Sequence, residues 1–157
     1  MCQLTLMNPI PIRRATIDDL SLISPLFDLY RQFYEQDSDL AKAENFLAQR
    51  LQLNESVIFL AFDGADPVGF TQLYPGFSSV SMGRTYLLND LYVVESHRRL
   101  GVGALLLETA VAHAQSEQAV RISLTTNVAN TTAQAVYEAQ GWEREKAFLT
   151  YNFKLNP

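Results

Sequence analysis

The chain has 157 residues, of which 48% are hydrophobic and 18% are charged. This composition is that of an ordinary globular protein with one sizeable core, and it excludes an intrinsically disordered chain. The formal net charge of −5 argues against broad nucleic-acid binding, which requires a basic surface. We therefore expect one domain over residues 1–157 and no nucleic-acid partner.

The cysteine content and the hydropathy both point to the cytoplasm. Cys2 is the single cysteine of the sequence, so no internal disulfide can form, as suits a reducing compartment. No apolar run is long enough to cross a bilayer, and the N-terminal segment lacks the pattern of a signal peptide. We expect a cytoplasmic protein without a membrane partner.

Helical spacing dominates the first third of the chain, after a short strand expected over residues 11–15. Thr16 is placed to cap a helix, and Asp19 would support its first turn. Steps of three and four then predict one helical face, formed by Leu20, Ile23, Phe27, Tyr30 and Tyr34. Pro25 interrupts this face, so we expect a kink or two helices, with Ser24 capping the second. The same spacing predicts another helix through Leu40, Ala43, Leu47 and Leu51.

From residue 57 the pattern changes to that of strands. A continuous apolar run over 57–62 predicts a strand buried on both faces, joined as a hairpin to a strand over 68–74. A loop rich in serine and glycine is expected next, over 75–82. The remaining expected elements are a central strand over 86–94, a helix over 104–115, a strand over 120–124, a helix over 131–140 and a closing strand over 149–155. This order predicts an α/β protein with a mixed sheet.

The turn between the central strand and the following helix is basic and rich in glycine. A helix N-terminus exposes unpaired N–H groups with partial positive charge, and glycines let a phosphate approach the backbone closely. Arg98 and Arg99 would add charge-assisted contacts. On its own, the pattern Arg-x-x-Gly-x-Gly over 98–103 also fits an ordinary tight turn with solvated arginines.

Two other phosphate-binding turns do not fit this sequence. A Walker loop requires lysine and then serine or threonine after the second glycine, where Ala104 and Leu105 stand. A dinucleotide-binding turn requires a small residue where Leu106 stands. Neither pattern explains the turn.

Residues 98–103 resemble the pyrophosphate-binding motif of the GNAT superfamily, the acetyl-CoA-dependent N-acyltransferases. Residues 89–94 resemble the central strand of that family, and residues 130–142 resemble its later motif of Asn, Ala, Tyr-Glu, Gly and an aromatic residue. The resemblance extends over residues 12–153, and the chain is identified as a member of this superfamily. It implies the GNAT fold, with about six to seven strands and helices on both faces, and acetyl-CoA as co-substrate.

The resemblance also implies which residues hold and use acetyl-CoA. The diphosphate would lie in the glycine turn, the strand backbone would pair with the pantetheine arm, and Asn130 would bond that arm or cap the next helix. Tyr137 falls at the position whose hydroxyl protonates the departing thiolate, although it also fits a core tyrosine. The residues expected to bind the cofactor are Leu91, Tyr92, Val93, Arg98, Arg99, Leu100, Gly101, Val102, Gly103, Ala104 and Asn130.

An acceptor amine must lose its proton before it can attack a thioester. For a lysine-like amine with a pKa of about 10.4, neutrality at pH 7 costs roughly 4 to 5 kcal/mol, so a base or a shifted pKa is needed. Asp90, on the central strand, is the first candidate base, although it could equally be an acid bonded to a neighbouring strand. Glu35 fits an exposed acid at a helix end better than a base. Phe27, Tyr30 and Tyr34 could line an acceptor pocket, but they fit core and rim aromatics better.

The leading expectation is an N-acetyltransferase that acts on a primary amine of a small molecule. Asn89 stands where the polyamine branch of the family often has an acid, which leaves amino acids, aminoalkyl compounds and aminoglycosides open. A protein lysine or N-terminal acetyltransferase and a non-catalytic acyl-CoA-binding module are the alternatives. No metal-ligand spacing is visible, since His97 and His113 are scattered singly. Relatives are often dimers, so a homodimer through the closing strand is a further expectation.

Overall fold

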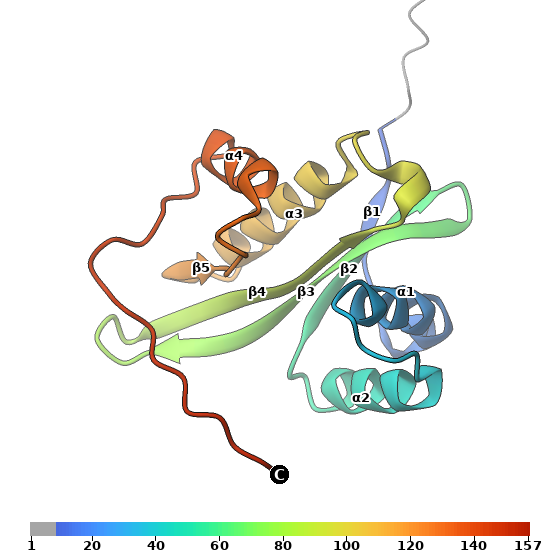
Figure 1. The fold of residues 1–157 in the computed structure, drawn as a ribbon, viewed down its shortest axis with the longest axis horizontal. Coiled ribbons are helices and arrows are strands. Elements are labelled where there is room, and N and C mark those ends of the chain that lie inside the picture. Colours follow the sequence, from blue (N-terminus) through green and yellow to red (C-terminus); the bar gives the residue numbers. More distant parts are fainter. Residues whose placement is uncertain (1–8) are drawn as a thin grey trace, which may run out of the picture. The chain divides into compact units, whose positions relative to one another are not determined.

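The computed structural model describes residues 9–157, and Cys2 lies outside the described residues. The chain divides into two compact units at Thr125 and Thr126, which are described separately. The first unit holds a five-stranded sheet in the order β1-β2-β3-β4-β5 (Figure 1). Its strands are β1 (Ile12–Arg14), β2 (Val57–Asp63), β3 (Asp66–Ser78), β4 (Gly83–Val93) and β5 (Arg121–Ser123).

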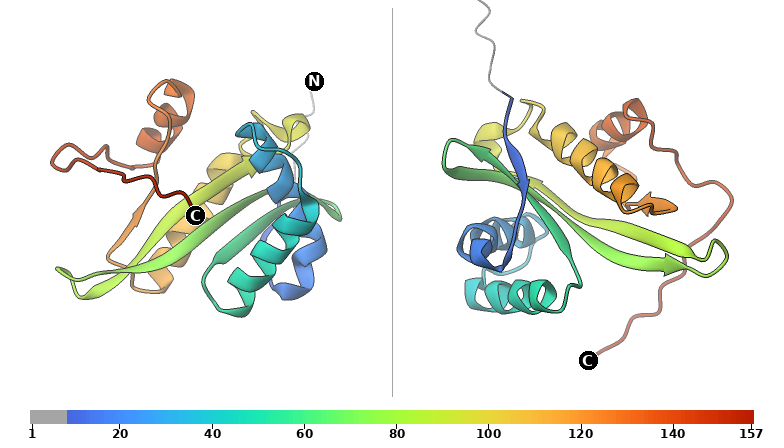
Figure 2. Two further views of the ribbon diagram at one scale, coloured as in Figure 1. Left: turned by 60° about the horizontal axis from the view of Figure 1, so that its bottom comes forward. Right: turned by 180° about the vertical axis from the view of Figure 1, so that it is seen from behind.

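Helices cover both faces of this sheet, as Figure 2 shows. Helices α1 (Leu20–Phe33) and α2 (Leu40–Gln52) lie on one face, and α3 (Val102–Ser116) crosses the other. The first four strands pair antiparallel, whereas β5 runs parallel to β4. Two short 3-10 helices, η1 (Ile17–Asp19) and η2 (Glu95–His97), precede α1 and α3. The expected α/β fold is therefore confirmed.

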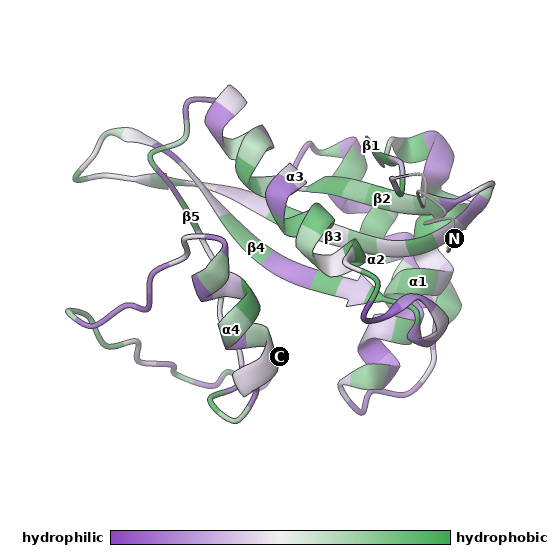
Figure 3. Cartoon of the chain, turned by 90° about the horizontal axis from the view of Figure 1, so that it is seen from above, coloured by the Kyte–Doolittle hydropathy of each residue, from purple (hydrophilic) through white to green (hydrophobic). Residues whose placement is uncertain are grey.

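A hydrophobic core lies between the sheet and the helices α1 and α2. Strand β2 has six buried residues in succession, which confirms a strand covered on both sides. The side chains on its α1 and α2 face pack with Ile23, Phe27 and Leu47 of the two helices and with Phe70 of β3. Figure 3 shows hydrophobic stretches along β2 and β3, and a hydrophilic stretch within β4.

Helix α1 continues through Pro25 as one helix, so the expectation of two helices is wrong. The Ser24 hydroxyl donates to the Leu20 carbonyl oxygen, 2.7 Å away, and does not cap a second helix. Pro25 removes one backbone donor. Because Ile23, Leu26 and Phe27 around it are buried, packing holds the helix through that position. Thr16 and Asp19 form the expected capping box, at η1.

The expected loop over 75–82 is mostly strand. Residues of β3 and β4 stay paired out to Ser78 and Gly83, so only residues 79–82 form the turn. Pro75 lies beyond Leu73, the last residue of β3 that pairs with β2. On that side β3 is an edge, where a residue without an N–H group is tolerated.

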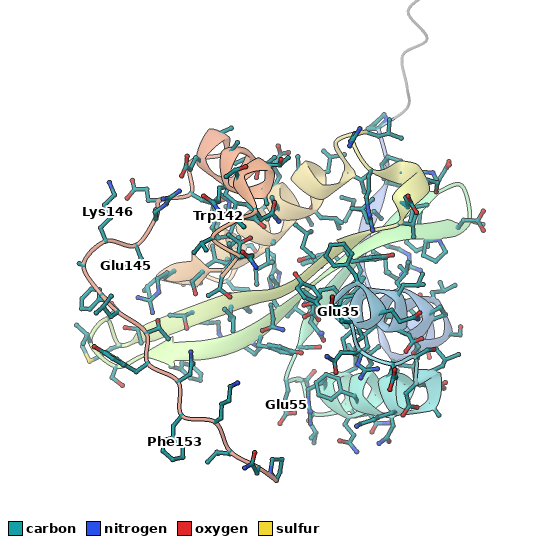
Figure 4. The ribbon with its side chains drawn as sticks, viewed as in Figure 1. Glu35, Glu55, Trp142, Glu145, Lys146 and Phe153 are labelled. Carbon is teal, nitrogen blue, oxygen red and sulfur yellow. The ribbon has the colours of Figure 1, made fainter. Side chains whose placement is uncertain are left out.

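The second unit contains α4 (Thr131–Ala139) and a C-terminal segment. No strand occurs over the described residues 142–157, so the closing strand predicted over 149–155 is wrong. Five strands are present in the described chain instead of six or seven. Alternating apolar residues define two faces, but a strand also requires a partner ladder. Phe153 is 90% exposed and projects from this segment (Figure 4).

No helix among the described residues is long and apolar enough to cross a membrane.

Candidate active site

A bulge in β4 determines where Asp90 points. Gln72 of β3 pairs with Asp90, whereas the adjacent Leu73 pairs with Leu88, so Asn89 is an extra residue in β4. A bulge reverses the alternation of side chains along a strand. Tyr86 therefore faces α3, where it meets the ring of His113, while Asp90 faces α1, where it meets Tyr30.

The carboxyl group of Asp90 is held by two amides. Asn89 Nδ2 donates to Asp90 Oδ1 over 2.8 Å, and Gln72 Nε2 donates to Asp90 Oδ2. Asp90 is 1% exposed and Gln72 is fully buried. Among the described side chains, Gln72 Oε1 is one of a few buried polar atoms that have no hydrogen-bond partner.

Burial raises the pKa of Asp90, although the hydrogen bonds from Asn89, Gln72 and Tyr30 act in the opposite direction. A buried carboxyl group is costly to ionise because it loses hydration. The pKa of Asp90 is therefore closer to neutral pH than that of an ordinary aspartate. This suits a group that takes up and releases protons.

Tyrosines surround Asp90 on the side of α1. Tyr30 is partly buried, and its hydroxyl donates to the Asn89 carbonyl oxygen over 3.3 Å. Burial raises the pKa of Tyr30, as does the negative charge of Asp90. Burial and the charge of Asp90 also raise the pKa of Tyr74. The Tyr34 ring packs edge-on against Tyr30 at 5.1 Å.

Acidic residues follow these tyrosines in the connection between α1 and α2. Glu35 comes two residues after the end of α1, is exposed and has a left-handed φ of 60°. Figure 4 shows it near that helix end. Asp37 and Asp39 are exposed in the same connection. Asp28 of α1 fixes this connection by accepting from Ser38 Oγ and from the backbone N–H of Asp39.

The second half of β4 has a partner strand on one side only. Strand β5 pairs with β4 at Thr85, Tyr86 and Leu87, whereas β3 pairs with it as far as Val93. Among the described residues, the backbone of Leu91 and Val93 thus has no strand beside it on the β5 side. A ligand with amide groups can add to such an edge as a further strand would.

The turn after β4 combines two left-handed residues with an uncapped helix start. Arg99 and Gly101 have φ values of 63° and 82°, and Gly101 is the N-cap residue of α3. Glycine has no side chain with which to cap a helix. A Cβ atom at Gly101 would meet nothing within 4 Å, and one at Gly103 would meet only Val93 Cγ2 at 4.0 Å. The turn therefore has the open space and the helix start that a diphosphate requires.

The structure places the two arginines of the turn differently. Arg98 Nε donates to the Val93 carbonyl oxygen over 2.9 Å, and its guanidinium lies 5.5 Å from the ring centres of Phe33 and Tyr92. Arg98 thus joins the end of β4 to α1. Arg99 is exposed beside the start of α3.

Sequence reasoning missed a contact that joins the start of this turn to the end of β2. His97 Nε2 lies 2.9 Å from Asp63 Oδ2, at the end of β2, and His97 Nδ1 lies 2.9 Å from Ser96 Oγ. The two partners are 34 positions apart in the sequence, so local spacing could not predict the pair. Leu100 is exposed and Val102 is buried, so the expected cofactor turn has one face in solvent and one in the core.

Asn130 and Tyr137 belong to the second unit. Asn130 Oδ1 accepts from the Ala133 N–H over 3.2 Å, so it caps α4. The Tyr137 ring lies 6.3 Å from that of Trp142, centre to centre, and the Trp142 N–H donates to the Tyr137 carbonyl oxygen. The motif over 130–142 therefore forms a capped helix with an aromatic pair at its end.

The motifs of both units occur together in one known family. The model of the acetyltransferase (GNAT) family matches residues 23–142. The chain belongs to the GNAT family. Because this family uses acetyl-CoA as donor, the protein is an acetyl-CoA-dependent N-acetyltransferase.

Individual relatives agree with this assignment. The uncharacterized N-acetyltransferase YhfO of Bacillus subtilis (strain 168) is 47% identical over 140 residues, which cover 89% of this chain and 94% of the relative. A probable acetyltransferase of known crystal structure is 41% identical to this chain, with a TM-score of 0.89. The match covers 94% of this chain and 99% of the other.

An aminoglycoside acetyltransferase from an uncultured soil metagenomic sample shares the fold. It is 18% identical, with a TM-score of 0.81, and the match covers 94% of this chain and 97% of the other. At this identity the likeness extends to the fold alone. The predicted family and acetyl-CoA dependence are thus confirmed, whereas the roles of single site residues stay predictions.

Proposed function

We propose that this GNAT enzyme transfers the acetyl group of acetyl-CoA to a primary amine of a small, cationic molecule, with Asp90 as the base. The observation that carries the proposal is the buried carboxyl group of Asp90, which the β4 bulge aims at Tyr30. Asp90 comes one residue before Leu91, where the open edge of β4 begins. A base for the amine is therefore next to the backbone expected to hold the thioester.

The turn and the edge fit acetyl-CoA. Arg99, Gly101 and Gly103, with the N–H groups at the start of α3, would hold the diphosphate. The backbone of Leu91, Tyr92 and Val93 would pair with the pantetheine arm, and one N–H group there would polarise the thioester carbonyl, which contributes roughly 3 kcal/mol. Acetyl-CoA supplies the acetyl group as a thioester with a thiolate leaving group.

Asp90 is proposed to receive the proton of the acceptor ammonium. Because its carboxyl group is buried, the proton would pass through the partly buried Tyr30 hydroxyl, which gives its own proton to Asp90 and takes one from the ammonium. The neutral nitrogen then forms the C–N bond as the C–S bond breaks. Tyr137 would donate a proton to the departing thiolate, and the second proton that the nitrogen loses on becoming an amide would restore the Tyr137 hydroxyl. Asn130 would bond the pantetheine arm besides capping α4.

The surroundings of Asp90 support a small cationic acceptor. Tyr30 and Tyr74 are near enough to Asp90 for its charge to act on both, and the Tyr34 ring packs against that of Tyr30. Aromatic faces and nearby acids both attract ammonium groups. The acidic residues of the α1–α2 connection supply the negative charge that would attract an ammonium group. The family match spans both units, which supports one catalytic domain over residues 1–157.

Release of free CoA with a panel of amines tests the acceptor class. The panel comprises a diamine, amino acids, an aminoglycoside, a lysine peptide and a peptide with a free N-terminus. Small amines are expected to release CoA at least ten times faster than either peptide. Faster release with a peptide would favour a protein acceptor, and release with no amine would favour a module that only binds acyl-CoA.

Asp90→Asn tests the base. The variant is expected to lose roughly 10²- to 10⁴-fold of the rate at pH 7. Its rate should then rise toward high pH, as the acceptor amine loses its proton without help. A pH–rate profile that matches that of the wild type would exclude Asp90 as the base.

A further inference from the structure

Gln72 has features that packing alone does not explain. It lies opposite Asp90 in the β3–β4 ladder and is fully buried. Its Nε2 donates to Asp90 Oδ2, while its Oε1 is buried without a hydrogen-bond partner among the described residues. A buried carbonyl oxygen without a partner destabilises the fold, because it has lost its hydrogen bonds to water.

The two protonation states of Asp90 need different partners. The carboxylate accepts hydrogen bonds only, and it is served by the N–H groups of Gln72 and Asn89. The carboxylic acid gains an O–H donor that requires an acceptor. The Gln72 side chain carries both functions, and turning its amide over by half a rotation would present Oε1 to that proton without any change of volume.

We propose that Gln72 is the positioning residue that serves Asp90 in both protonation states, as donor to the carboxylate and as acceptor for the acid. This inference rests on the proposed function of Asp90 as the base. Asn89 holds the other carboxyl oxygen throughout, so only one oxygen, Oδ2, receives the proton. The proton is thereby kept at the atom that faces Gln72.

Other ionisable groups near Asp90 do not replace Gln72 in this role. Tyr30 and Tyr74 have raised pKa values and stay neutral in the same range. The charge of Tyr34 acts to raise the pKa of Tyr30, whereas the charge of Arg50 acts to lower that of Tyr74. Arg50 itself pairs with Glu55 at 2.6 Å. Among these groups, Asp90 is therefore the one whose pKa is raised toward neutral pH by its burial.

Titration of the free enzyme by ¹³C NMR of the Asp90 carboxyl carbon tests the inference without any acceptor. Gln72→Met keeps the side-chain length but removes both the donor and the acceptor. It is expected to raise the pKa of Asp90 by about 0.5 to 1, because the charge-assisted hydrogen bond that the carboxylate loses is about twice as strong as the neutral one that the acid loses. An unchanged pKa would overturn the inference.

Thr71→Val is the matched control. Thr71 is equally buried on the same strand, and its hydroxyl donates to the backbone oxygen of Asp90 over 2.9 Å. Valine has nearly the same shape, and the carboxyl group of Asp90 keeps its partners. The pKa of Asp90 should stay within about 0.3 of that of the wild type. A shift equal to that of Gln72→Met would mean that any loss of strand packing moves the pKa, and would overturn the inference.

Gln72→Glu provides a second variant in case the methionine variant does not fold. It places a second carboxyl group against Asp90, and two such groups share one proton. The variant should show two coupled titrations, one of them well above that of Asp90 in the wild type. Independent titration of the two acids would show that residue 72 does not face the carboxyl group, and would also overturn the inference.

pH–rate profiles separate this inference from the proposed function. In an Asp90→Asn background, Gln72→Met should leave the profile unchanged, because Gln72 acts through Asp90. If the NMR shift occurs but Asp90→Asn leaves the rate profile unchanged, the pairing with Gln72 stands and the role of Asp90 as base fails. If Asp90→Asn alters the profile but Gln72→Met leaves the pKa of Asp90 unchanged, the role of Asp90 as base stands and the pairing with Gln72 fails.

Discussion

A single extra residue, Asn89, decides which helix layer the candidate base meets. Without it, Asp90 would follow the alternation of Tyr86 and Leu88 and point to the same face as they do, toward α3. With it, Asp90 faces Tyr30, and the Asn89 side chain holds the carboxyl group. The asparagine thus redirects the strand and supplies a hydrogen bond at the same position.

Gly103 provides the sharpest test of the cofactor turn. Leucine at this position has space, because a Cβ atom there would meet nothing closer than Val93 at 4.0 Å. Its side chain would nevertheless cover the N–H groups at the start of α3. We expect Gly103→Leu to weaken acetyl-CoA binding at least ~10-fold, about 1.4 kcal/mol, with a melting temperature close to that of the wild type.

Calorimetry with acetyl-CoA measures this loss, and Ala41→Leu is the control. Ala41 is the second residue of α2, as Gly103 is of α3, and it is exposed. The control should bind acetyl-CoA as the wild type does. Unchanged affinity in Gly103→Leu would place the diphosphate elsewhere.

Local patterns predicted the glycine turn and Asp90, but they could not predict the partners of Asp90. Gln72 is 18 residues away and appears in the sequence only as a polar residue within an apolar strand. Its register with Asp90 depends on the bulge, and a bulge is set by pairing between strands. The same limit applies to the contact between His97 and Asp63.

At the scale of elements, most boundaries were predictable because apolar spacing and caps are local. The three errors, at Pro25, over 75–82 and over 149–155, all involve contacts between elements. Packing of Ile23 and Phe27 keeps α1 intact at Pro25, which propensity alone does not reveal. Pairing of β3 with β4 converts an expected loop into strand, although its Gly, Pro and Ser content favours a turn.

The packing of α3 on the sheet makes stability depend on pH through His113. This ring lies 5.5 Å from Phe59 and 5.3 Å from Tyr86, centre to centre. Its Nε2 has no hydrogen-bond partner among the described residues. Burial lowers the pKa of His113, and so does the charge of Arg14, while Glu117 acts in the opposite direction.

The sign of this dependence follows from the lowered pKa. In the unfolded chain the histidine titrates near about 6.5, so below that pH the unfolded state binds a proton that the native state excludes. The free energy of unfolding should fall as pH drops from about 7 to 5, by less than ~1.4 kcal/mol per pH unit, because the ring is partly exposed. Urea unfolding at several pH values measures the slope. His113→Leu should flatten it, and an equal slope in the variant would assign the effect to other groups.

At the scale of the whole molecule, the net charge of −5 bears on the choice of acceptor. A negative protein attracts a cationic amine from a distance, and salt screens this attraction over a Debye length of ~8 Å at physiological ionic strength. The exposed acids Glu35, Asp37 and Asp39 lie close in sequence to Tyr34, so the field is expected to be strongest near the proposed acceptor site.

The rate with a cationic acceptor should therefore depend on salt. At saturating acetyl-CoA, we expect kcat/KM for such an amine to fall roughly threefold between low salt and about 0.5 M NaCl, with kcat little changed. Steady-state kinetics at several ionic strengths measures the effect. Replacing Glu35 and Asp37 with glutamine and asparagine should reduce the salt dependence, because those two charges contribute to the field. A kcat/KM that rises with salt would instead indicate an acceptor that the acidic surface repels, and would contradict a cationic substrate.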